Sequence, residues 1–116
     1  MLKKRMLKKT SKPVQRKPSV VTAEDYAAQL TEDLKDPTEA AAYLEAAIQE
    51  GDNEALLVAM RHVAAAHGGM AAIAQQTGLS RESLYRAFSK RGNPTVATLS
   101  SVLAATGLRL SVQPVN

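Results

Sequence analysis

The supply of large side chains is the feature that most restricts the fold of this chain. Its 116 residues include three Tyr and one Phe, and neither Trp nor Cys. Ala, Leu, Val, Ile and Met must therefore fill the core, and this palette is more typical of packed helices than of a β-sandwich. The lack of Cys excludes disulfides, thiolate metal sites and cysteine nucleophiles. A chain of this length predicts one all-α domain with at most a short tail.

Capping side chains mark the ends of the expected helices. Asp36-Pro37-Thr38-Glu39 combines a capping residue, a proline that fits the first turn and a glutamate at the capping-box position. Ile48 belongs to the apolar face expected on the helix that follows. The other N-cap candidates are Thr22, Asp52 and Ser80. The expected helices cover residues 23 to 30 or 34, 37–50, 53–67, 70–77, 81–90, and 95 or 96 to 106.

The end of the chain has the period of a β-strand. Apolar and polar residues alternate from residue 108 to 113, and Pro114 follows them. The sequence therefore predicts a short C-terminal strand. Because a single strand leaves its backbone groups unpaired, it needs a partner. That partner is either Val20-Val21 or another subunit, and the pattern favours a second copy of the chain.

Charge is distributed in three blocks. Residues 1–21 hold eight basic residues and no acid, residues 22–60 hold ten acids with Lys35 as the one base, and residues 61–116 hold six bases with Glu82 as the one acid. The first block predicts a disordered basic tail, either a solubilising extension or a non-specific clamp on phosphates. We expect residues 22–116 to form the folded domain, with acidic helices first and a basic half that suits a polyanion.

The segment from Met70 to Phe88 predicts a helix-turn-helix. Ala74 is small where two helices would cross, and Gly78 follows four residues later, where the tight turn favours a positive φ. With Leu84 and Phe88 turned inward, the opposite face of the second helix is polar. The residues expected to read base edges in the major groove are Arg81, Glu82, Tyr85 and Arg86.

A second group of residues suits contacts with the DNA backbone, which position a protein without reading sequence. Glu82 has two interpretations, because it could accept a hydrogen bond from cytosine or be an ordinary first-turn acid. An all-α domain with a solvated basic helix face is the plainer alternative to DNA binding. The residues expected at phosphates are Ser80, Ser83, Lys90, Arg91, Asn93 and Thr95.

A combination of short motifs resembles one family. The helix-turn-helix and its continuation resemble the lambda-repressor-like (Xre-type) DNA-binding domain, and residues 22–113 resemble the addiction-module antidote proteins, the HigA-like antitoxins of type II toxin–antitoxin pairs. The basic extension before Thr22 departs from that pattern. The motifs are Asp36-Pro37, Tyr43-Leu44-Glu45-Ala46-Ala47, Gly51-Asp52, Gly78-Leu79-Ser80-Arg81, Leu84-Tyr85-Arg86-Ala87, Gly92-Asn93-Pro94-Thr95 and Gly107-Leu108-Arg109-Leu110.

The resemblance implies a homodimeric autorepressor that binds a palindromic operator and neutralises a RelE/HigB-like ribonuclease toxin. The acidic residues 22–60 suit such a cationic partner, although an ordinary acidic surface explains them equally well. Two alternatives stay open: a stand-alone Xre-type regulator, and a protein-interaction module without specific DNA readout.

The remaining expectations concern what the protein lacks. The sequence contains no nucleophile elbow, phosphate-binding glycine loop or metal-ligand set, so we expect neither enzymatic activity nor a cofactor or metal. No apolar run approaches the length of a membrane span. The basic start is not followed by an apolar stretch, so we expect a cytoplasmic protein.

Overall fold

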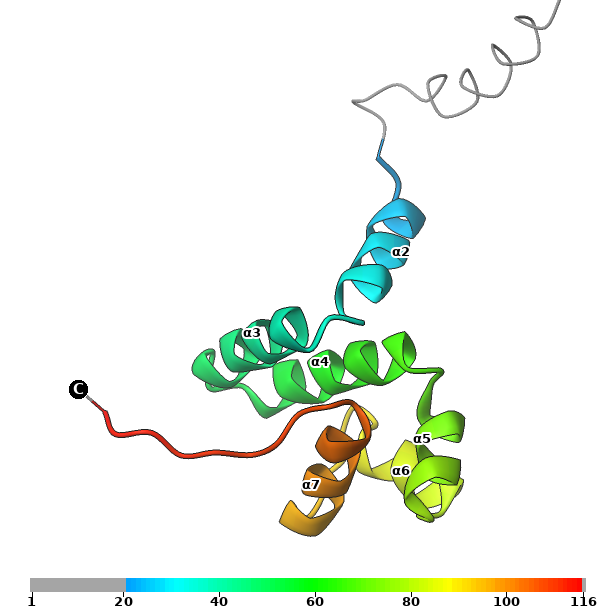
Figure 1. Cartoon of the computed structure of the whole chain (residues 1–116), viewed down its shortest axis with the longest axis vertical. Helices are drawn as coiled ribbons and strands as arrows, with labels where there is room; N and C mark the ends of the chain where they lie inside the picture. Colours follow the sequence, from blue (N-terminus) through cyan, green and yellow to red (C-terminus); the bar gives the residue numbers. More distant parts are fainter. Residues whose placement is uncertain (1–20, 116) are drawn as a thin grey trace, which may run out of the picture.

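The computed structural model describes residues 21–115, and these fold into six α-helices (Figure 1). The all-α prediction is confirmed. The predicted disordered tail, residues 1–21, lies outside the described residues except for Val21. The helices are α2 (Ala23–Asp33), α3 (Pro37–Gln49), α4 (Asn53–Ala66), α5 (Met70–Thr77), α6 (Arg81–Ala87) and α7 (Val96–Ala105).

The predicted N-caps are confirmed, and one capping detail is wrong. Thr22 and Asp25 form a reciprocal capping box, in which each backbone N–H donates to the other side chain at 3.0 Å. Asp36 and Asp52 also accept N–H groups of the first turns that they precede. Glu39 forms no such box with Asp36 in the described part of the chain, because the Asp36 N–H already donates to the carbonyl of Asp33 at 3.1 Å.

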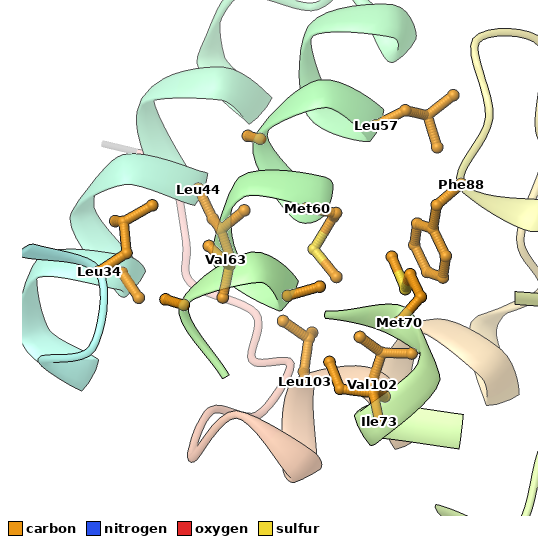
Figure 2. Packing of buried hydrophobic residues seen from close by; sticks show 14 of the residues in the cluster. Leu34, Leu44, Leu57, Met60, Val63, Met70, Ile73, Phe88, Val102 and Leu103 are labelled. Carbon is orange, nitrogen blue, oxygen red and sulfur yellow. The ribbon is translucent and has the colours of Figure 1, made fainter. Parts of the chain in front are cut away.

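The core forms around α4. Met60 and Val63 of this helix are almost fully buried, and α3 packs against one side of α4 while α5, α6 and α7 close the other (Figure 2). Aliphatic side chains supply nearly all of this core, as the composition requires. The other apolar side chains that are almost completely buried are Leu34, Ile73, Leu84, Phe88 and Val102.

The packing of α2 and the exposure of Ile48 on α3 both bear on function. Helix α2 contributes no buried side chain, although Leu34 directly after it is 2% exposed. Ile48, which we expected on the inward face of α3, is 55% exposed. Ile48 faces an open groove that it lines together with Leu56 of α4 and Leu103 of α7, so the apolar face expected from periodicity is wider than the buried one.

The C-terminal strand is not formed in the described residues. The Leu108 N–H donates to the carbonyl of Leu103 at 2.8 Å, as α7 ends, and the chain then continues without helix or strand to residue 115 (Figure 1). Residues 21–115 contain no second strand that could pair with residues 108–112, and an extended segment becomes a strand only through such a ladder.

Within residues 21–115, no single helix is long and apolar enough to cross a membrane. Helices α4 and α5 reach the required length and composition only as a pair bent by 78°, and both contribute buried side chains to the core.

Candidate nucleic-acid interface

A tight turn joins α5 to α6. Gly78 has φ +79°, a conformation that glycine adopts without strain, and its N–H donates to the carbonyl of Ala74 at 2.9 Å. The hydroxyl of Thr77 donates back to the carbonyl of Ile73 at 2.8 Å and accepts the Leu79 N–H at 3.3 Å. Local hydrogen bonds and one glycine therefore hold the angle between α5 and α6.

Helix α6 separates its apolar and polar side chains onto two faces. Leu84 is 0% exposed, and Phe88 at the C-cap is 1% exposed, so one face is anchored in the core. Because residues four apart share a helix face, Arg81 and Tyr85 lie together, as do Glu82 and Arg86. The structure brings these four predicted base-reading side chains to one exposed face: Arg81, Glu82, Tyr85 and Arg86.

The residues predicted at phosphates are all exposed as well, but several already have partners. The hydroxyls of Ser80 and Thr95 cap α6 and α7 by accepting the N–H groups of Ser83 and Thr98. The Nζ atom of Lys90 lies 3.8 Å from a carboxylate oxygen of Glu54. Within the described residues, the Arg91 and Asn93 side chains have neither a hydrogen bond nor an ion pair.

The end of α6 is fixed by contacts that we did not predict. Arg61 on α4 donates a hydrogen bond from Nη1 to the carbonyl of Phe88. Gly92 lies so close to α6 that an added Cβ would be 2.0 Å from the carbonyl oxygen of Ala87. The expected helix over 81–90 is therefore too long, since the chain turns after Ala87. A bond between residues 27 positions apart leaves no local sequence signal.

The acidic residues lie mainly on other helices. In Figure 1, α2 lies above α4, α3 lies beside α4, and α6 lies below α4. Most acids of residues 22–60 are exposed, and Lys35 pairs with Glu32 at 3.1 Å. The molecule therefore presents a largely acidic end and a largely basic end.

One polar contact links the two helices behind the acidic end. The Tyr43 hydroxyl lies 2.7 Å from Nδ1 of His62, between α3 and α4. Burial raises the pKa of the Tyr43 phenol above its usual value of 10.0. We assign this pair a structural role.

Comparisons with known proteins place the chain in a family. A family described as probable addiction module antidote proteins matches residues 24–114. The chain belongs to this family. The matched region includes helices α3–α7 completely.

A relative in Haemophilus influenzae is also similar to this chain. It is described as an uncharacterized protein and is 40% identical over 84 residues, which cover 72% of this antidote-family chain and 86% of the relative. No solved structure gives a significant match.

Proposed function

We propose that this protein is a homodimeric antitoxin that binds a palindromic operator, represses its own operon and neutralises a small basic ribonuclease of the RelE/HigB type. Membership of the antidote family supports the antitoxin part of the proposal, because an antidote acts on a toxin. It also favours a regulatory protein over an enzyme. The DNA-binding part depends on the interface itself.

The observation that carries DNA binding is the exposed cationic face of a core-anchored helix after a glycine turn. Arg81 and Arg86 protrude from α6, and Arg91 and Asn93 follow in the next turn with their donors uncommitted. This arrangement suits a helix lying in the major groove, with its side chains at base edges and the flanking turn at phosphates. An arginine can bind guanine through two hydrogen bonds, which are worth about 1–3 kcal/mol of discrimination.

Charge supports the toxin part of the proposal. The exposed acids of α2 and α3 suit a cationic protein, since complementary charge accelerates encounter and suppresses wrong partners. The acidic end is also remote from α6 (Figure 1), so one chain could hold a basic protein and a DNA duplex at different ends.

Binding of the full-length protein to the DNA upstream of its own gene tests the readout. Arg86→Ala is expected to weaken operator binding by about 1–3 kcal/mol per half-site, or about 5- to 150-fold, with little effect on unrelated DNA. Arg91→Ala should weaken both by a similar factor, because phosphates carry no sequence. Lys35→Ala is the matched control, since it removes an exposed cation between α2 and α3.

An equal loss for all DNA with Arg86→Ala, and no preferred site in the unaltered protein, would contradict the base-reading assignment. Co-purification with the product of an adjacent gene tests the antitoxin assignment. A basic partner of about 100 residues, released as salt rises, is expected. Specific operator binding without any such gene would favour a stand-alone regulator.

A further inference from the structure

The segment after α7 has the properties of a strand without a partner. Within the described residues, no backbone group of residues 109–115 hydrogen-bonds to another backbone group. Two of its apolar side chains are exposed to solvent, Leu110 to 45% and Val112 to 96%. Unpaired backbone and alternating apolar side chains together form a ready site for another strand.

This segment borders an apolar groove of about 220 Å³. Leu44 and Ile48 of α3, Leu56 of α4 and Leu103 of α7 line it, and the C-terminal segment contributes Leu108 and Leu110. The exposure of Ile48 is therefore part of a larger open apolar surface. The groove also includes one acid and one base, Glu45 and Arg109, neither of which has an ion pair in the described residues.

We propose that this surface is the dimer interface, in which residues 108–112 of two copies pair as antiparallel strands across a twofold axis and Val112 of each copy packs beside the groove of the other. A twofold interface brings each surface patch against itself, so strongly acidic or strongly basic patches repel there. The acidic end is of that kind, and the exposed face of α6 carries a net positive charge, with Arg81 and Arg86 against Glu82. The groove has one charge of each sign, which makes it compatible with a second copy.

The pairing register follows from the sequence. Directly opposite residues in an antiparallel pair lie on the same face, so the axis must pass through a residue for apolar side chains to meet. An axis at Leu110 pairs Leu110 with Leu110 and Leu108 with Val112, which uses every apolar residue. An axis at Arg109 would place Val112 opposite Thr106, which is buried at the C-cap of α7 and cannot join a strand. An axis at Ser111 would place Leu108 opposite Pro114, which has no N–H for the ladder.

A single-cysteine experiment tests this register, because the protein has no Cys of its own. Leu110→Cys is expected to form a disulfide-linked dimer under mild oxidation, since its Cβ atoms would lie about 4.5–5.5 Å apart. Ser111→Cys is the matched control. The two Ser111 residues would lie diagonally, about 7–8 Å apart, on the sheet face away from Leu110, so cross-linking should be several-fold slower.

A second pair of variants tests the energetics. Val112→Asp is expected to raise the dimer dissociation constant about 100-fold, because two valines leave the interface and two carboxylates enter it. Val115→Asp adds the same charge at a residue that is 97% exposed and lies beyond the paired segment, so it should leave the constant unchanged. Sedimentation velocity gives the constant, and circular dichroism checks that both variants fold.

This inference rests on the proposed function for the homodimer, whereas the choice of interface and the binding of an operator can fail separately. A dimer that survives Val112→Asp, or that cross-links equally well in the Leu110→Cys and Ser111→Cys variants, overturns the interface and leaves operator binding intact. A monomeric protein overturns the interface and also the homodimer of the proposed function. A dimer that cross-links as expected but binds no operator supports the interface and contradicts the proposed function. Loss of toxin binding without loss of the dimer in Val112→Asp assigns the groove to the toxin and overturns the inference.

Discussion

Gly92→Ala is expected to be the most disruptive methyl addition in the candidate nucleic-acid interface. An added Cβ would lie 2.0 Å from the carbonyl oxygen of Ala87 and 2.7 Å from that of Arg86, whereas ordinary contact begins at 3.4 Å. The difference of 1.4 Å must come from the backbone, because no side chain can rotate away. The loop that carries Arg91 and Asn93 would therefore move relative to α6.

The magnitude follows from comparison with Gly78→Ala. An added Cβ at Gly78 has no heavy atom within 4 Å, so that variant bears only the strain of φ +79°. This strain is about 1–2 kcal/mol, partly offset by about 0.4–1 kcal/mol from a less flexible unfolded chain. We expect a loss of about 1 kcal/mol for Gly78→Ala. For Gly92→Ala we expect about 3 kcal/mol, the upper end of usual overpacking costs.

Urea unfolding followed by circular dichroism measures both free energies of unfolding. Operator binding below the unfolding transition then separates stability from geometry, and Gly92→Ala should bind more weakly even where it is fully folded. A stability loss for Gly92→Ala no larger than that for Gly78→Ala would refute the close approach of the loop to α6.

Two further predictions concern contacts made by α4. Arg61→Met keeps the aliphatic stem but removes the donor to Phe88, and should lower the free energy of unfolding by about 1.5–3 kcal/mol, the usual worth of a hydrogen bond to a charged group; an unchanged urea midpoint would show that this bond contributes nothing. Because burial raises the pKa of Tyr43 in the folded protein, the unfolded chain ionises first as pH rises past 10.0, so stability should fall there. Tyr43→Phe should remove that part of the decline, as urea unfolding on either side of pH 10.0 would measure.

Local signals explain which parts of the fold could be predicted. Thr22, Asp36 and Asp52 act within a few residues of themselves, so their sequence positions fix where helices begin. Gly78 likewise determines a turn without distant partners. The polar face of α6 also follows from periodicity, since Leu84 and Phe88 define the opposite side.

Long-range contacts explain which parts of the fold could not be predicted. The end of α6 depends on Arg61 and Gly92, and neither contact has a signature in the segment that it limits. The exposure of Ile48 depends on the open groove that α3 forms with α4 and α7, which are distant in sequence or follow a turn. The C-terminal strand could be recognised by its alternation, but its formation requires a second strand that residues 21–115 do not contain.

The exposed packing of α2 has a consequence for how protein partners could be exchanged. Since none of its side chains is buried, α2 can unwind while α3–α7 keep their packing, and its amide protons should exchange through this partial opening. A protein that clasps α2 must then supply the ordering free energy of the helix. Changes at Thr22 or Asp25 could therefore alter the lifetime of such a complex while α3–α7, with the exposed face of α6, keep their shape.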